Sequence, residues 1–258
     1  MSNLTDQQRK DIEKIINDSL DIAERFWRES GGELEKEAVL SATDISNEVM
    51  YSEERISSQI PNHKKISPFK SVNAEMIAIV ADMRGSTRHA KTKEGKIHPL
   101  KRIFLETSAL LPAMEKVINL KGGNVTEYLG DGILGFFEFS TENIYKSYNA
   151  ASIIITEVRV ILNNILHERY ELPETGINIG VGLAKSQVII HATGIENKHP
   201  KAFGSCVYDA TKLSSGTNVI GVSEGLKSLW PTSPKGTLQF REETFRDLRG
   251  YKINPKNN

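Results

Sequence analysis

The sequence predicts an α+β fold in which strands and helices follow the order β-α-β-β-α-β. Three observations support this prediction. Short apolar runs typical of buried strands alternate with longer segments whose apolar residues have helical spacing. A glycine pair at 122–123 ends the first long helical segment of the main domain. A Gly-Asp-Gly turn at 130–132 then joins two strand-like runs into a hairpin.

The first part of the chain is predicted to be helical. Apolar residues recur at helical spacing between positions 5 and 30, which is typical of a helix that buries one face. Gly31 and Gly32 follow this segment and are expected to end the helix. A second helix is predicted over residues 33–50. These two helices would form an extension in front of the strand-containing part of the chain.

A linker is predicted between this extension and the main domain. Residues 51–74 are polar and contain Pro61 and Pro68, a composition that favours an irregular segment over a helix or strand. The sequence therefore divides into an N-terminal helical extension with its linker, residues 1–74, and a main domain, residues 75–258.

The main domain contains the segments that define the fold. Strands are predicted at 76–82, 124–129, 133–139, 176–184, 187–191 and 218–222, and a terminal hairpin at 236–254. Helices are predicted over about 100–120, 142–168, 206–215 and 223–229. The order strand, helix, hairpin, helix, strand is that of a ferredoxin-like core.

Composition excludes several classes of function. Among 258 residues, Lys+Arg and Asp+Glu both number 33, so no excess of positive charge favours nucleic acid or an anionic membrane as a partner. Cys206 is the only cysteine, so no intrachain disulfide can form and a reducing compartment is expected. The longest apolar runs are about eight residues, whereas a bilayer-spanning helix needs roughly 20. We expect a soluble cytoplasmic protein.

Two aspartates are the strongest functional signal. Asp82 ends an apolar strand-like run and is followed closely by Gly85, and Asp131 lies in the glycine turn of the hairpin. Carboxylates beside glycine-rich turns suit divalent cations and the phosphates that those cations carry. The two aspartates are 49 residues apart, with a helix-length segment between them, so they can converge on one pair of ions. We therefore predict a two-metal nucleotide enzyme.

At these residues the chain resembles the class III nucleotide cyclases. The similarity extends from about Glu75 to the C-terminus. It is carried by Asp-Met-Arg-Gly-Ser-Thr at 82–87, the glycine hairpin at 122–132, Ile-Gly-Val-Gly-Leu at 179–183, the segment 203–213 and Leu-Arg-Gly at 248–250. The resemblance implies that the main domain is a cyclase catalytic domain with the ferredoxin-like core of that family.

The resemblance also implies how metals and substrate are held. Asp82 and Asp131 would bind two Mg²⁺ or Mn²⁺ ions, with the carbonyl of Met83 as a further ligand. Such a pair of ions can activate an attacking ribose 3′-hydroxyl and stabilise the leaving pyrophosphate. The alternative for each aspartate is an ordinary turn-capping role, since Asp favours turns.

Backbone amides beside Asp82 are candidates for the triphosphate. Gly85, Ser86 and Thr87 would present N–H groups to the β- and γ-phosphates at the start of a helical segment, the alternative being an ordinary turn. Arg249 or, alternatively, Lys252 of the terminal hairpin is a further candidate. Arg84 is expected to be solvated.

The positions that choose the base depart from both purine patterns of the family. They are Glu127 and Lys201 here, which match neither the adenine pair nor the complete guanine pair. Tyr208 stands where the family has an asparagine that orients the ribose, and Lys212 replaces the arginine that stabilises the transition state. This set is similar to the standalone pyrimidine cyclases of bacterial Pycsar antiphage systems, which make cyclic CMP or cyclic UMP as a signal to a separate effector.

The chemistry of these residues fits a pyrimidine. Glu127 can accept from the exocyclic amine of cytosine or from N3–H of uracil, and Lys201 can donate to a base carbonyl. The amine-accepting role favours CTP over UTP. Lys212 would place positive charge on the α-phosphate, and Tyr208 would stack on the sugar or bond to it. The alternatives are surface positions for Glu127 and Lys201, and simple packing for Tyr208.

Family members of this kind work as head-to-tail homodimers, in which the metal carboxylates and the Lys212-type residue come from opposite protomers. The N-terminal helices would brace such a dimer or, equally, cap the sheet of their own protomer. Two other readings stay open. One is a purine cyclase with an unusual pocket, and the other is a cyclase-like module that binds a nucleotide without turnover. The histidines show no metal-ligand spacing, and no role is assigned to them.

Overall fold

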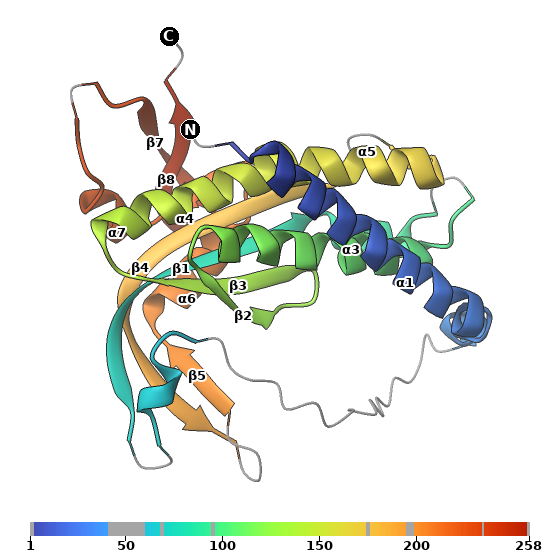
Figure 1. Ribbon diagram of the computed structural model, residues 1–258, viewed down its shortest axis with the longest axis horizontal. Coiled ribbons are helices and arrows are strands. Elements are labelled where there is room, and N and C mark those ends of the chain that lie inside the picture. The colour runs from blue at the N-terminus through green and yellow to red at the C-terminus, as the bar shows by residue number, and fades with distance from the viewer. Residues whose placement is uncertain are drawn as a thin grey trace.

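The computed structural model describes residues 3–40, 60–67, 70–93, 96–173, 176–194, 199–233 and 235–256. Figure 1 shows a curved sheet with helices on both faces. The strands are β1 (Val72–Arg84), β2 (Asn124–Tyr128), β3 (Gly132–Glu138), β4 (Asn178–Thr193), β5 (His199–Phe203), β6 (Ile220–Val222), β7 (Leu238–Phe245) and β8 (Leu248–Pro255). The α-helices are α1 (Asp6–Leu40), α2 (Ser86–Lys91), α3 (Pro99–Leu120), α4 (Thr141–Ile153), α5 (Arg159–Tyr170), α6 (Ser205–Leu213) and α7 (Glu224–Ser228).

The sheet has the strand order β2-β3-β1-β4-β6-β8-β7, and β5 pairs with β4 outside this path. Neighbouring strands are antiparallel except β4 and β6, which are parallel. The segment order β1-α3-β2-β3-α4-β4 and the strand order β2-β3-β1-β4 confirm the predicted ferredoxin-like arrangement. The remaining strands extend this sheet beyond β4.

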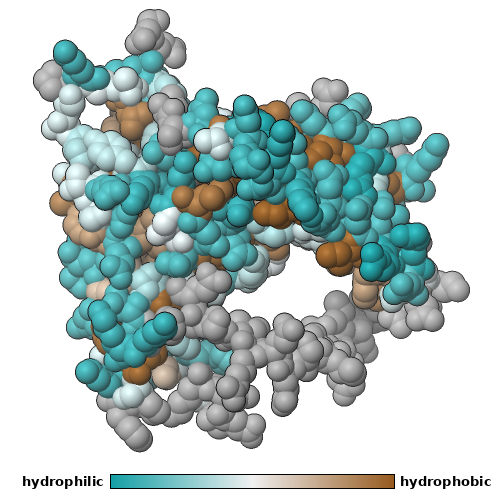
Figure 2. Space-filling view, in the orientation of Figure 1, coloured by the Kyte–Doolittle hydropathy of each residue, from teal (hydrophilic) through white to brown (hydrophobic). Residues whose placement is uncertain are grey.

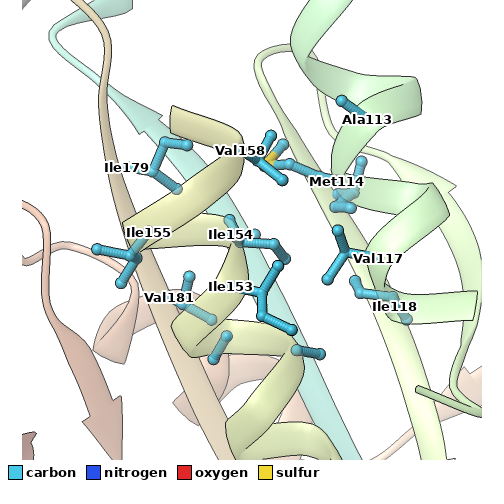
Figure 3. Packing of buried hydrophobic residues seen from close by; sticks show 14 of the residues in the cluster. Ala113, Met114, Val117, Ile118, Ile153, Ile154, Ile155, Val158, Ile179 and Val181 are labelled. Atoms are coloured by element: carbon cyan, nitrogen blue, oxygen red, sulfur yellow. The ribbon is translucent and has the colours of Figure 1, made fainter. Parts of the chain in front are cut away.

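The two faces of the sheet bury separate groups of side chains. Alternate residues of β1 point to opposite faces, as in any strand. Ile77, Ile79 and Met83 belong to the larger core, which α1, α3, α4 and α5 cover. Figure 3 shows part of this core, with Met114 and Val117 of α3 directed toward Ile153 and Ile154 of the neighbouring helix.

The second face is covered mainly by α6. Here Met76, Ala78 and Val80 of β1 pack with Cys206 and Ala210 of that helix. The helix lies very close to β4, because a Cβ atom on Gly182 would be only 2.0 Å from the carbonyl oxygen of Ala210. The glycines at 180 and 182 are therefore required for the helix to dock.

One long helix crosses the larger core. The segment α4, a π-helical turn (Ile154–Val158) and α5 form a continuous helix, close to the helix predicted over 142–168. Among the described residues, it is the one helix long and apolar enough, by length and composition, to cross a membrane. Most of that stretch is buried against the sheet and α3, as in a core helix of a soluble protein.

The predicted end of the first helix is wrong. α1 passes through Gly31 and Gly32 and ends at Leu40. Just before these glycines the helix is held by tertiary packing, since the buried Trp27 ring lies 6.0 Å from the ring of Phe104 in α3. Tertiary contacts thus override the local tendency of glycine to stop a helix. The predicted second helix is therefore a continuation of the first as far as residue 40, and residues 41–59 lie outside the described part.

The position of α1 agrees in part with the alternative that the N-terminal helices cap their own protomer. The helix packs mainly on α3 and also contacts α5 of its own chain. The Arg169 side chain at the end of α5 bonds to Asp21 and Glu24 of α1. The face of the molecule over α1 and α5 is mostly hydrophilic (Figure 2).

Two strand predictions also need correction. The predicted strands at 176–184 and 187–191 are one strand, β4, which pairs with β1 from Val72 to Arg84. β1 itself begins at Val72, a few residues before the predicted strand, so the last residues of the predicted linker belong to the sheet. The short strand β5 was not predicted. Ile60, also in the predicted linker, is buried in the smaller core.

Candidate active site

The two candidate metal aspartates lie at the same end of neighbouring strands. β1 pairs with β3 so that Asp82 is opposite Gly132. The N–H of Met83 donates to the carbonyl of Asp131 over 3.1 Å, which places both aspartates on adjacent rungs of the ladder. A Cβ atom on Gly132 would be 2.9 Å from Asp82 Oδ1. The glycine after Asp131 thus leaves room for the Asp82 carboxylate over the hairpin.

Arg84 links the two carboxylates electrostatically. Its guanidinium forms an ion pair with Asp82, and the two side chains are only 19% and 21% exposed. Burial lowers the pKa of Arg84, and the nearby Asp131 carboxylate acts in the opposite direction. The Nε atom of Arg84 is buried with no hydrogen-bond partner. The expectation that Arg84 is solvated is therefore wrong, because its position on β1 directs it to the same face as Asp82.

The turn after Arg84 leads into a short helix. Gly85 has φ +81°, a left-handed conformation that favours glycine. The N–H groups of Arg88 and His89 both donate to the Gly85 carbonyl, at 2.9 and 3.1 Å. The preceding amides of Ser86 and Thr87 belong to the first turn of α2, whose N–H groups have no intrahelical acceptor.

The two predicted base-reading residues are in contact. Lys201 Nζ, from β5, lies 2.9 Å from the Glu127 carboxylate of β2, and their side chains are 43% and 29% exposed. Glu127 is opposite Leu134 in the β2–β3 register, and Leu134 belongs to the smaller core. Glu127 is therefore on the same face of the sheet as Asp82. The structure thus brings together two residues that are 74 positions apart in the sequence.

The two predicted catalytic residues are one turn apart on α6. Lys212 Nζ lies 4.4 Å from the centroid of the Tyr208 ring, and this ring is among the exposed aromatic side chains. Lys212 also pairs with Asp247, from the turn between β7 and β8. The hydrogen bond to Asp247, followed by that to Tyr208, raises the pKa of Lys212, and the pKa of Asp247 is lowered in return.

The structure was compared with solved structures and the sequence with known proteins. No family model and no curated protein matches the sequence. The fold is similar to the adenylyl cyclase CyaB from P. aeruginosa, with a TM-score of 0.57 and 16% identity over 71% of this chain and 94% of that chain. This is the fold of class III nucleotide cyclase catalytic domains.

Two further cyclase domains have similar structures. The guanylyl cyclase Cya2 has a TM-score of 0.55 and 17% identity over 71% of this chain and 93% of that chain. The non-canonical dimeric guanylyl cyclase domain of the RhoGC fusion protein from the aquatic fungus Blastocladiella emersonii has a TM-score of 0.52 and 17% identity. That match covers 73% of this chain and 99% of the fungal domain. The chain therefore contains a nearly full-length cyclase fold.

Within this cyclase fold, two arginines near the end of the terminal hairpin are candidates for the substrate phosphates. The predicted residue, Arg249, is 80% exposed and pairs with Glu242 of the same hairpin. Its neighbour Arg246 is close enough to Arg84 to lower the pKa of that guanidinium. Sequence reasoning missed both Arg246 and Asp247. Their position directly before the Leu-Arg-Gly motif was the available signal.

Proposed function

We propose that this protein is a nucleotide cyclase whose substrate is a pyrimidine nucleoside triphosphate, with CTP preferred over UTP. The product would be the 3′,5′-cyclic monophosphate, released with pyrophosphate. One observation carries the cyclase assignment: in a cyclase fold, the two strand-end aspartates lie on adjacent rungs of β1 and β3 and both interact with one guanidinium. Residues 75–258 would form the catalytic domain, and residues 1–74 its extension.

The residues present fit two Mg²⁺ or Mn²⁺ ions. Asp82, Asp131 and the Met83 carbonyl offer only oxygen donors, which these ions prefer. Among the described residues no group of three or more His, Cys, Asp or Glu side chains is arranged around one point, so substrate phosphates would complete the coordination. When bound, the ions would lower the pKa of the ribose 3′-hydroxyl and neutralise the leaving pyrophosphate.

The reaction needs little beyond positioning and charge. The ribose 3′-oxygen forms a bond to the α-phosphorus, the bond from that phosphorus to the pyrophosphate oxygen breaks, and the hydroxyl proton is released. The amides of Gly85, Ser86 and Thr87 would hold the β- and γ-phosphates. Arg249 would contribute a further positive charge. No covalent intermediate with the protein is required.

The remaining residues would bind the nucleoside and the α-phosphate. Contact with Asp247 raises the pKa of Lys212, which favours its protonated form, and this positive charge would stabilise the α-phosphate in the transition state. Tyr208 is exposed enough to stack on the sugar. Glu127 and Lys201 pair with each other, and a cytosine edge with one donor and one acceptor would replace this contact by two hydrogen bonds.

The active form would be a head-to-tail homodimer. A non-canonical dimeric cyclase domain is among the similar structures, which supports dimerisation in general, and the resemblance to the family supports the head-to-tail arrangement. In the proposed dimer, Asp82 and Asp131 of one protomer face Lys212 and Tyr208 of the partner subunit, which builds two equivalent sites. The protein would act in the cytoplasm. The resemblance to Pycsar cyclases is the support for a role in antiphage signalling through a separate effector.

Turnover with separate nucleotides tests the proposal. The full chain is incubated with ATP, GTP, CTP or UTP and Mn²⁺, and products are identified by mass spectrometry. Cyclic CMP with release of pyrophosphate, lost in an Asp82→Ala variant, is the expected result. Cyclic AMP or cyclic GMP as the main product would support the purine alternative, which the adenylyl and guanylyl cyclases among the similar structures favour. No cyclic product from any nucleotide would favour the non-catalytic module.

A further inference from the structure

A buried polar network joins α2 to α3 beside the candidate phosphate loop. His89 of α2 and both Arg102 and Glu106 of α3 are almost fully buried. His89 Nδ1 lies 2.7 Å from Glu106 Oε2, and Arg102 Nε donates to Glu106 Oε1 over 2.8 Å. The Arg102 guanidinium also lies 3.4 Å from His89 Nε2. The three side chains therefore form a closed triangle of hydrogen bonds.

The chemistry of the partners determines the direction of the hydrogen bonds at His89. A guanidinium has only donors, so the His89 Nε2 atom must accept in its contact with Arg102. The ring proton is then on Nδ1, from which it is donated to Glu106. In this arrangement both carboxylate oxygens of Glu106 receive a hydrogen bond.

The same histidine is connected to the Gly85 turn. His89 is the only buried residue of α2, whose six residues are too few to be stable alone. Its backbone N–H donates to the carbonyl of Gly85 over 3.1 Å, and its side chain is held by α3. The position of the turn is thus tied to α3 through one residue. An apolar anchor would bury the helix without fixing its direction, whereas directional hydrogen bonds do both.

From these contacts we infer that His89 is a positioning residue, which holds the Gly85–Thr87 amides in the orientation needed to bind a triphosphate. The inference rests on the proposed function of that loop. His89 does not contact the substrate in this arrangement. It acts through the backbone of α2, so its loss should weaken nucleotide binding more than it slows the chemical step.

Three variants test the inference. His89→Leu introduces an apolar side chain of similar size and removes the hydrogen bond to Glu106. His89→Asn keeps an N–H near the position of Nδ1, and Lys91→Ala changes an exposed residue of the same helix. Hydrogen exchange of the Arg88, His89 and Thr92 amides is measured without nucleotide, since these amides bond to carbonyls within the α2 segment. Steady-state kinetics with CTP and thermal unfolding are measured in parallel.

The expected result is specific to α2. In His89→Leu, these amides should exchange at least about tenfold faster while the β1 and β4 amides keep their protection. The KM for CTP should rise about tenfold with kcat changed by less than about threefold, as for a loss of ground-state binding. His89→Asn should recover most of both effects, and Lys91→Ala should match the wild type.

Other results overturn the inference. Unchanged exchange in α2 of His89→Leu would mean that the network does not hold the helix. Equal loss of protection throughout the sheet would show that His89 stabilises the whole domain and does not specifically position α2. If His89→Leu does not fold, the same exchange measurement on the milder His89→Asn variant tests the inference. If the wild type turns over no nucleotide, the proposed function fails, and the exchange data alone decide whether His89 positions the turn.

Discussion

The two faces of the central sheet differ in what they contribute. The face under α1, α3, α4 and α5 carries the larger core, which is built from apolar side chains and includes the side chain of Met83 but none of the charged candidate site residues. The opposite face carries a smaller core under α6, and Asp82, Glu127 and Lys212 lie around it. Because neighbouring residues of a strand point to opposite faces, one strand can serve both purposes.

Within β1, residues on one face contribute to stability and residues on the other face contribute to the candidate site. Met83 is buried on the helical face, and its neighbours Asp82 and Arg84 are on the face that stays partly open. A site needs accessible polar groups, which a fully covered face cannot provide without large desolvation costs. Substitutions on the open face should therefore affect activity, and substitutions on the covered face should affect unfolding.

The largest effect is expected at the metal carboxylates. Asp131→Asn and Asp82→Asn should each reduce pyrophosphate release at least about 100-fold, because each removes a negatively charged ligand from the proposed ions. Glu75→Gln, at the opposite end of β1, is the matched control and should retain activity. A melting temperature that falls together with activity in the aspartate variants would break the proposed separation of the two faces.

The covered face should give the largest change in stability. Phe137 is fully buried in the larger core, opposite Ile77 of β1. Phe137→Ala should lower the free energy of unfolding by about 3–5 kcal/mol, since it leaves a cavity in a packed core. Urea unfolding monitored by circular dichroism measures this. The folded fraction should keep its KM for CTP, and a changed KM would contradict the assignment of this face to stability.

The base-reading pair should give an intermediate effect on selectivity. Glu127→Gln should lower kcat/KM for CTP about tenfold, because a charged acceptor for the cytosine amine becomes a neutral amide. Competition between CTP and UTP, with both cyclic products quantified by mass spectrometry, measures the ratio. Glu138→Gln is the control, as an exposed carboxylate on β3. Equal losses for all four nucleotides would show that Glu127 does not read the base.

A smaller effect is expected from Arg84. Its ion pair with Asp82 has to be given up when a cation binds that carboxylate. Arg84→Met keeps the length of the side chain without the charge, so Mn²⁺ should bind about three- to tenfold more tightly, as expected when one competing charge is removed. Electron paramagnetic resonance of free Mn²⁺ measures this without nucleotide. Weaker Mn²⁺ binding would show instead that Arg84 supports the site.

The smallest effect concerns pH. Contact with Asp247 raises the pKa of Lys212. The interaction is therefore present at neutral pH and is lost as the pH rises through the pKa that Lys212 has in the folded protein. Asp247→Asn should therefore move the alkaline limb of the activity profile to lower pH. In a Lys212→Arg background the same change should leave that limb in place, because arginine stays charged. If Asp247→Asn does not move the alkaline limb in the protein that has Lys212, then deprotonation of Lys212 is excluded as the cause of the activity loss at high pH.

Local patterns in the sequence predicted much of the fold. The alternation of strand and helix from β1 to β4, the glycine hairpin and the terminal hairpin were all predicted, because each depends on contacts between residues near in sequence. The continuity of α1 through Gly31 was not, since it depends on α3. The single long strand β4 was also missed, because its middle is held by pairing with a longer β1.

The candidate site likewise has features that the sequence predicted and features that only the structure revealed. The residue types at 82, 127, 131, 201 and 212 pointed to nucleotide chemistry without any coordinates. The pairings of Lys212 with Asp247, His89 with Glu106 and Lys201 with Glu127 join different segments of the chain, and no sequence periodicity predicts them. The sequence alone determined which chemical groups and which local elements this protein has. Only the tertiary structure decided which groups meet, because the energy of a polar contact depends on burial and direction, and both are set by strands and helices that are remote in the chain.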